Sequence, residues 1–248
     1  MESREEKTVN KDNKKMAQQR KADERARAER TAKGKKLLPL FALLLVAAII
    51  AVAGFFTWRA KKKAAEMEVD GGYLENGQYD MSNDELTSIE IKVKDYGTIK
   101  ADLDATAAPI TVENFVSLAK EGFYDGLTFH RIMDEFMIQG GDPNGNGTGG
   151  SGKTIKGEFS QNGVKNPISH ARGAISMARS QDMDSASSQF FIVQTDSYFL
   201  DNNYAGFGYV TEGMEIVDQI CKDAKPTDDN GTIPKEEQPV IESITVLD

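Results

Sequence analysis

The 248-residue sequence predicts a mainly β protein: a closed eight-stranded antiparallel barrel capped by two helices, preceded by a single transmembrane helix and a basic N-terminal tail. Three observations predict this class. One long segment carries no charge, the net charges on its two sides differ in sign, and the pattern of the chain from Thr87 onward is β-rich. The predicted organisation is a tail over 1–36, a membrane helix over 37–58, a juxtamembrane linker over 59–86 and a folded domain over 87–248.

The charge distribution divides the chain into a basic part and an acidic part. Residues 1–63 carry 17 Lys and Arg against 7 Asp and Glu, whereas residues 64–248 carry 13 against 32. The acidic domain argues against nucleic acid as a partner. The single cysteine excludes an internal disulfide, and the sequence has no Cys/His cluster of the kind that holds zinc.

The segment from Leu37 to Trp58 has the properties of a membrane-spanning helix. It contains no charge, and as a helix it extends ~33 Å, compared with ~30 Å for the hydrocarbon core of a bilayer. A buried core helix is the alternative, but such helices are usually amphipathic, and this segment is apolar on every side. Cleavage as a signal peptide stays open at Ala51-Val52-Ala53, although the preceding 36 residues exceed a usual n-region.

The flanking charges predict the orientation of this segment. Residues 17–36 contain eight Lys and Arg, whereas four follow the segment, at Arg59 and Lys61 to Lys63. The positive-inside rule therefore places the N-terminus in the cytoplasm and the acidic domain outside a cell membrane that the chain crosses once. The lipid bilayer is thus an expected partner of residues 37–58.

Residues 64–86 show no sustained apolar period and contain several turn formers, which indicates a tether. Beyond Thr87 the pattern becomes β-rich, and two alternating segments around Asp95-Tyr96-Gly97 predict a hairpin. The predicted strands are 89–93, 98–103, 128–132, 136–140, 174–178, 189–194, 207–210 and 242–247. Eight strands suffice to close a barrel, and closure removes edge strands.

Two helices accompany these strands. Apolar residues at i, i+3, i+4 and i+7 predict a helix near 110–120, with Val112, Phe115, Val116 and Ala119 on one face. A second short helix is predicted over 213–222, where Cys221 packs as a small hydrophobic residue.

Several motif matches lack the context that their chemistry needs. Gly147 to Thr154 satisfies GxxxxGK[ST], but a phosphate-binding loop works between a buried strand and a helix N-terminus, and neither flank fits. The overlapping Asp142 to Gly147 opens like a calcium loop, but Lys153 stands where the bidentate Glu is needed. Hydrolysis by a Ser-His-Asp arrangement finds little support, and we expect His130 and His170 to be hydrogen-bonded structural residues.

Five short motifs follow one another between residues 129 and 192. They are Phe129-His130-Arg131-Ile132, Phe136-Met137-Ile138-Gln139-Gly140-Gly141-Asp142, Gly147-Thr148-Gly149-Gly150, Ser176-Met177-Ala178-Arg179 and Ser188-Gln189-Phe190-Phe191-Ile192. In this order they closely resemble the cyclophilin family of peptidyl-prolyl cis–trans isomerases. The resemblance covers essentially all of 87–248, and the family fold, an eight-stranded antiparallel barrel capped by two helices, agrees with the strand count above.

The resemblance implies an isomerase of X–Pro-containing polypeptides that needs no metal, cofactor or covalent intermediate. It implies Arg131 as the catalytic residue, which donates to the proline nitrogen as the amide twists, and Gln139 as the group that holds the substrate carbonyl. The apolar floor for the proline ring would be Phe136, Met137, Phe191 and Leu200. The further substrate-binding residues would be Ala178, Arg179, Gln189, Phe199 and Tyr204. Outside the membrane, such an enzyme would assist the folding of secreted or surface proteins.

The sequence departs from the best-known eukaryotic members of the family. Phe199 stands where they commonly have Trp, Tyr204 where they commonly have His, and Arg179 where they commonly have Asn; residues 142–157 are also arranged differently. Loss of the indole N–H that cyclosporin-type ligands use predicts weak cyclosporin binding with catalysis retained. These features resemble bacterial members.

Without the resemblance, aromatic residues on strands are more often core than pocket, and Arg131 more often belongs to a solvated face. Two other hypotheses for function stay open. One is a non-catalytic proline-peptide-binding module or holdase that uses the same pocket. The other is a membrane-tethered nucleotide-binding protein.

Overall fold

The computed structural model of the chain describes residues 72–247, which belong to one compact unit, Met67–Asp248. The strands are β1 (Leu86–Val93), β2 (Gly97–Asp104), β3 (Phe129–Met133), β4 (Met137–Gly140), β5 (Ala174–Met177), β6 (Phe190–Val193), β7 (Gly206–Glu212) and β8 (Ile241–Val246). The helices are α2 (Pro109–Lys120) and α3 (Met214–Asp223), with 3₁₀ turns η1 (Ser160–Asn162), η2 (Tyr198–Leu200) and η3 (Lys235–Glu237).

The predicted tail, the predicted membrane helix and the first part of the linker lie outside the described residues. Within residues 72–247, no helix is both long and apolar enough to cross a membrane.

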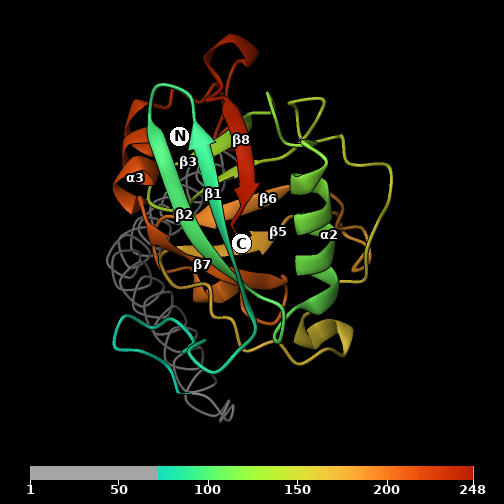
Figure 1. Cartoon of the computed structure of the whole chain (residues 1–248). Coiled ribbons are helices and arrows are strands. Elements are labelled where there is room, and N and C mark those ends of the chain that lie inside the picture. Colours follow the sequence, from blue (N-terminus) through green and yellow to red (C-terminus); the bar gives the residue numbers. More distant parts are fainter. Residues whose placement is uncertain (1–71, 248) are drawn as a thin grey trace, which may run out of the picture. The chain divides into compact units, whose positions relative to one another are not determined.

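The eight strands that the structure describes form one antiparallel sheet in the order β3-β4-β6-β5-β7-β2-β1-β8. The predicted strand count, the antiparallel arrangement and the two helices are confirmed. Figure 1 shows α2 and α3 on opposite sides of the strongly curved sheet. The predicted closure is wrong, because β3 and β8 are the two edges of the sheet and no ladder joins them. The sheet is a half-barrel.

The seam between β3 and β8 stays open because of the register at which the two edges meet. Thr128 and Val240, which directly precede β3 and β8, form an isolated antiparallel bridge, and Phe129 N donates to the Pro239 carbonyl at 2.9 Å. In that register β3 continues opposite residues 235–239, which contain η3 and Pro239, a residue without a backbone N–H. The outer edge of β3 instead forms backbone hydrogen bonds with the loop at 231–233. The edge is thereby covered without closure of the barrel.

The β1–β2 hairpin follows from its alternating sequence. One face of each strand is buried, through Ile89, Ile91 and Val93 on β1 and Ile99, Ala101 and Leu103 on β2. The turn between them uses the left-handed region at Asp95 (φ 65°) and has a positive φ of 129° at Gly97. Asparagine, aspartate and glycine tolerate such backbone angles best, which is why this tripeptide predicts the hairpin correctly.

Both helices bury one apolar face against the sheet. Helix α2 begins with Pro109, where a missing N–H costs nothing, and buries Val112, Phe115 and Ala119. The Phe115 ring lies 4.9 to 5.3 Å from the rings of three other buried aromatic residues, which are Tyr124, Phe190 and Phe207. Helix α3 buries Val217, Ile220 and Cys221, as its predicted packing requires.

The last part of the predicted linker packs on the domain. Tyr73 and Tyr79 form an isolated bridge, and Tyr79 is buried. The backbone N–H of Tyr79 donates to the Tyr209 hydroxyl (3.0 Å), and the Ser169 hydroxyl donates to the Gly77 carbonyl (2.6 Å). Because one buried tyrosine and these hydrogen bonds hold it, the segment 73–79 is part of the folded unit.

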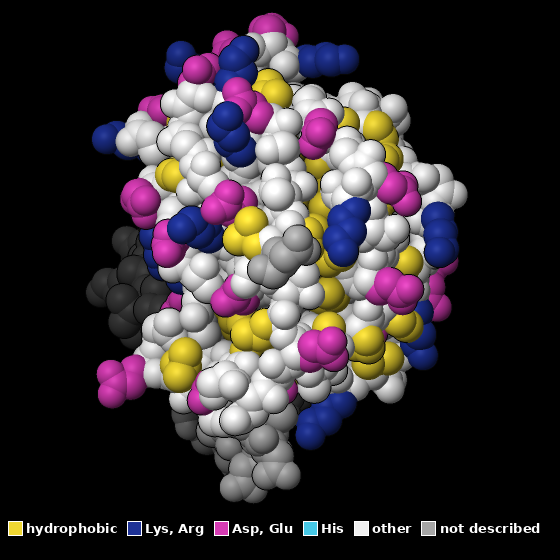
Figure 2. All heavy atoms as spheres, viewed as in Figure 1, with side chains coloured by type: hydrophobic (Ala, Val, Ile, Leu, Met, Phe, Trp, Pro, Cys, Tyr) yellow, Lys and Arg dark blue, Asp and Glu magenta, His cyan; other side chains and the backbone are white. Residues whose placement is uncertain are grey.

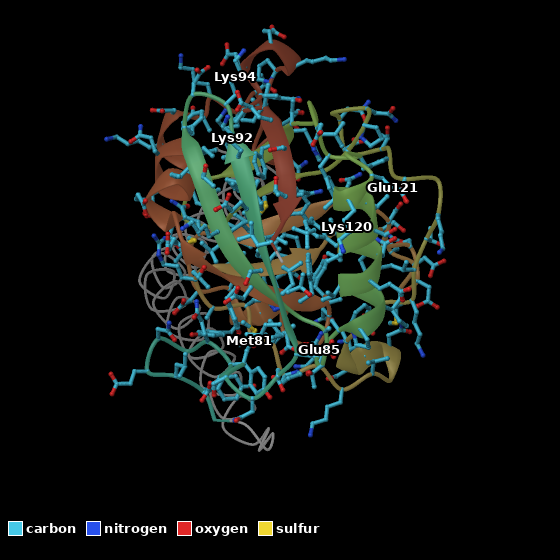
Figure 3. All side chains as sticks on the ribbon, viewed as in Figure 1. Met81, Glu85, Lys92, Lys94, Lys120 and Glu121 are labelled. Atoms are coloured by element: carbon cyan, nitrogen blue, oxygen red, sulfur yellow. The ribbon has the colours of Figure 1, made fainter. Side chains whose placement is uncertain are left out.

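The surface over β1, β8 and α2 is polar. Figure 2 shows basic and acidic side chains interspersed there, with the apolar side chains in small separate areas. Lys92 and Lys94 lie near one end of β1 and Glu85 near the other (Figure 3), and Lys92 pairs across the strands with Glu242 at 2.8 Å. An exposed pair of this kind contributes little to stability.

We predict that Phe115→Ala lowers the free energy of unfolding by about 3–5 kcal/mol, because it leaves a cavity inside the aromatic cluster. Chemical denaturation of the full-length chain measures this change. Ile110→Ala, on the same helix but exposed, is the matched control and is expected to change stability by less than about 1 kcal/mol. Equal losses in the two variants would contradict the packing described here.

Candidate active site

One row of side chains crosses the strands β3, β4, β6 and β5. Arg131 lies opposite Gln139, Gln139 opposite Phe191, and Phe191 opposite Ser176. Residues paired directly across a sheet point to the same face, so the strand register alone brings these four side chains together.

A cavity of about 160 Å³ lies beside this row. It is lined by Arg131, Phe136, Met137, Gln139, Ala178, Arg179, Phe191, Leu200 and Tyr204. Nine of the eleven residues predicted for the site therefore line one cavity, although they come from β3, β4, β6, η2 and the segments before β4, after β5 and before β7.

The floor of the cavity is apolar. Met137, Phe191 and Leu200 are buried, and Phe136 is half-buried beside them. Tyr204 meets the Phe191 ring edge-to-face, with 5.8 Å between the ring centroids. Such a surface suits a small apolar ring and excludes water from the groups around it.

Arg131 extends along this floor and is held at both ends of its guanidinium. Its Nε donates to the Asn230 carbonyl (2.7 Å) and its Nη1 to Gln139 Oε1 (3.2 Å). Its Nη2 lies 3.0 Å from the Met133 sulfur. Burial lowers the pKa of Arg131, but the group stays charged because arginine's ordinary pKa is far above neutrality. The result is a fixed cationic donor beside an apolar surface.

Two predicted site residues lie outside this cavity. Phe199 is 68% exposed at the rim, where its ring packs on Phe136 with 5.5 Å between centroids. Gln189 lines an adjoining cavity and accepts a hydrogen bond from Gln139 Nε2 at 3.0 Å. Both residues therefore contact a residue of the main cavity without lining it.

Beneath the floor, the structure assembles a serine, a histidine and an aspartate in hydrogen-bonding order. His170 Nδ1 lies 2.8 Å from Asp201 Oδ1, and Nε2 lies 3.0 Å from Ser176 Oγ. A carboxylate oxygen accepts, so Nδ1 donates to Asp201, and the second hydrogen bond joins Nε2 and the serine hydroxyl. His170 and Ser176 are fully buried, and neither lines a described cavity, so this arrangement does not reach a substrate.

The structural role expected for the two histidines is thus correct for His170. The imidazole of His170 also stacks on Phe191, with 6.1 Å between ring centroids. For His130 the expected hydrogen bonds are wrong: the ring is buried, and neither nitrogen has a partner among the described residues. Burial lowers the pKa of His130, which keeps the ring neutral.

The two loop motifs do not form the sites that their sequences suggest. Residues 147–154 lie in an irregular loop with no strand or helix directly at either end. The Asp142 carboxylate accepts from the backbone N–H groups of Asn144, Asn146 and Gly147. Burial alone would raise the pKa of Asp142, but these three donors lower it below its usual value. Among the described residues, no group of three or more acidic, His or Cys side chains is placed to hold a metal ion.

Two residues that hold the site could not be found from sequence patterns. Asn230 anchors Arg131 through its backbone carbonyl, and Phe159 packs its ring 5.0 Å from the Arg179 guanidinium. Every residue has a backbone carbonyl, so the residue type at position 230 does not predict this contact. The sequence Asp228-Asp229-Asn230-Gly231 indicates only a turn. Phe159 lies twenty positions from Arg179 in the chain, and only the fold brings them together.

Comparison with known proteins agrees with this geometry. Residues 88–246 match the family model described as cyclophilin type peptidyl-prolyl cis-trans isomerase/CLD. The chain is 44% identical over 144 residues to peptidyl-prolyl cis-trans isomerase B of Bacillus subtilis, covering 58% of this chain and 92% of that protein. A peptidyl-prolyl cis-trans isomerase of Helicobacter pylori is 43% identical over 146 residues, covering 57% of this chain and 86% of that protein.

Solved structures show the same likeness. A cyclophilin type peptidyl-prolyl cis-trans isomerase of Cryptosporidium parvum superposes with a TM-score of 0.58 at 27% identity, covering 66% of this chain and 99% of that chain. A second structure of that protein, solved in the presence of the dipeptide Ala-Pro, gives a TM-score of 0.57 at 28% identity, covering 65% of this chain and 99% of that chain. The chain belongs to the cyclophilin-type peptidyl-prolyl cis–trans isomerase family, and it is an enzyme of that class.

We predict that Asp201→Ala lowers the free energy of unfolding by about 1–3 kcal/mol, because two N–H donors of the buried His170 lose their acceptor. Thermal and chemical unfolding of the full-length chain measure the loss. Asp201→Asn keeps an oxygen acceptor, so its free energy of unfolding is expected to be closer to that of the original protein. An Asp201→Ala variant as stable as the original would show that this network does not support the site.

Proposed function

We propose that Arg131 is the catalytic residue of this isomerase. An X–Pro bond rotates over a barrier of ~18–20 kcal/mol and takes tens of seconds or more unaided. Twisting the amide localises the nitrogen lone pair, so a donor aimed at that nitrogen binds the twisted state better than either planar state. The observation that supports this role is the guanidinium fixed beside the apolar floor of the cavity.

The other lining residues have complementary roles in this proposal. The floor formed by Phe136, Met137, Phe191 and Leu200 receives the proline ring, and Gln139 turns its amide N–H from Gln189 to the substrate carbonyl. The apolar surroundings also favour the less polar twisted amide. Lowering the barrier by about 7 kcal/mol accelerates rotation roughly 10⁵-fold. No metal, cofactor or covalent intermediate takes part in this scheme.

Arg131→Ala is expected to lower kcat/KM for a prolyl peptide by about 100-fold or more, because the twisted nitrogen loses its charged donor. Isomerisation is measured by NMR exchange, with the full-length chain in a non-ionic detergent. Arg131→Lys keeps the charge but not the fork, and an intermediate rate is expected. Equal catalysed rates for Arg131→Ala and the original protein would rule out this mechanism, because catalysis would then not depend on the guanidinium.

We also propose that cyclosporin binds this enzyme weakly. Phe199 is exposed at the rim of the cavity, where it offers a ring but no N–H donor. Phe199→Trp restores an indole N–H and is expected to tighten inhibition by about five- to tenfold, the worth of one hydrogen bond. Inhibition titrations of the two proteins measure the difference. Tight inhibition of the original protein, complete at one equivalent of cyclosporin, would contradict this expectation.

The cellular role that we propose rests on the sequence. Residues 37–58 anchor the chain in a cell membrane, residues 1–36 lie in the cytoplasm, and the catalytic domain acts outside on secreted or surface proteins. The uncharged segment and the excess of basic residues before it support this topology.

Trypsin added to intact spheroplasts of a bacterium expressing the full-length chain tests this topology. Cleavage at Lys61 to Lys63 is expected to release the domain, while the basic tail stays protected until the membrane is lysed. A domain that stays attached in intact spheroplasts and is released only after lysis would reverse the proposed orientation.

A further inference from the structure

The active-site cavity shares a wall with a second, larger cavity of about 330 Å³. Gln139, Ala178 and Arg179 line both, and the loop at 147–149 with polar residues between 180 and 189 forms the rest of the larger one. A polypeptide whose proline occupies the smaller cavity therefore has a neighbouring side chain within reach of the larger one. Arg179 stands at the boundary between the two.

The charges that line these cavities are positive. Arg131 and Arg179 line the smaller cavity, and Arg179 is the one charged residue described in the lining of the larger cavity. This contrasts with the domain as a whole, since residues 64–248 carry 32 Asp and Glu against 13 Lys and Arg. The carboxylate of Asp184 does not line the larger cavity, and it accepts hydrogen bonds from Gly157 N and Asn162 Nδ2 instead.

Arg179 is held in a fixed position at this boundary. Its guanidinium carbon lies 4.8 Å from the centroid of the Tyr204 ring and 5.0 Å from that of Phe159. Its Nε donates to the Asn203 carbonyl and its Nη1 to the Ser180 carbonyl, each at 2.9 Å. Because these contacts already restrict the side chain, little conformational entropy is lost when a ligand binds it.

One end of this guanidinium is free to bind. Among the described residues, Nη2 of Arg179 has no hydrogen-bond acceptor, and Arg179 forms no ion pair. The hydroxyls of Ser180, Ser185 and Ser187 in the larger cavity donate to neighbouring protein oxygens instead. The arginine is thus a charged donor without a carboxylate, and a carboxylate is the acceptor that a guanidinium binds best.

We infer that Arg179 makes this enzyme select X–Pro substrates with an aspartate or glutamate at a flanking position, whose carboxylate enters the larger cavity and binds Nη2. The inference rests on the proposed function, because it requires the proline ring to occupy the smaller cavity.

The test uses pairs of peptides that differ only in Glu against Gln, placed in turn at each of the two positions before and after the X–Pro pair. NMR exchange with the full-length chain in a non-ionic detergent gives kcat/KM for each peptide without a coupling protease. The Glu peptide is expected to react about three- to tenfold faster than its Gln partner at one position, as for a partly exposed charge-assisted hydrogen bond. Raising the salt concentration is expected to reduce this ratio.

The variant Arg179→Gln is expected to bring the Glu/Gln ratio to about one, whatever happens to the absolute rates. Lys120→Gln removes the same charge from an exposed position on α2 (Figure 3), outside both cavities, and is expected to keep the ratio. A ratio of one at every position in the original protein, or a ratio that survives Arg179→Gln, overturns the inference. Absence of isomerisation for every peptide would instead contradict the proposed function itself.

Discussion

The site depends on the register of four strands. Arg131, Gln139, Phe191 and Ser176 are successive cross-strand neighbours on β3, β4, β6 and β5. A slip of one residue in any of these pairings would move a side chain to the opposite face of the sheet, and the cationic donor would lose its apolar floor. The buried face of the same strands, with Phe129, Ile138 and Phe190 in the core, sets that register. Core packing and the geometry of the site therefore depend on the same pairings.

A second layer of polar residues holds the floor of the cavity from beneath. Ser176 bonds His170, His170 bonds Asp201, and Asp201 directly follows the 3₁₀ turn that carries Leu200. The Tyr209 hydroxyl continues this layer, because it bonds the backbone of both Ser169 and Tyr79. The segment before β1 is thereby tied to the loop that carries His170. Buried polar groups that are fully partnered in this way fix one arrangement of the chain.

Local pattern was sufficient for most of the fold. Two-residue alternation located β1 and β2, the 3.6-residue period located α2, and Asp95-Tyr96-Gly97 located the first turn. The other six strands and α3 also lie where they were predicted. The five motifs also named residues that line a single cavity, although the spacing alone gave no reason to place Arg131 beside Phe191. Closure of the barrel was not readable, because it depends on the residues that face an edge strand, and 235–239 lie about a hundred positions from β3.

By itself, the sequence determined the strands, the helices, the charge asymmetry and the family, since each depends on the order and spacing of residue types. Only the tertiary structure decided which groups meet. It left the half-barrel open, packed residues 73–79 on the domain and placed Arg179 between Phe159 and Tyr204. It also buried His130 with no hydrogen-bond partner among residues 72–247. These outcomes depend on contacts between distant segments, many of them with backbone groups. Backbone groups are nearly the same in every residue, so the contacts that they form cannot be predicted from the pattern of residue types.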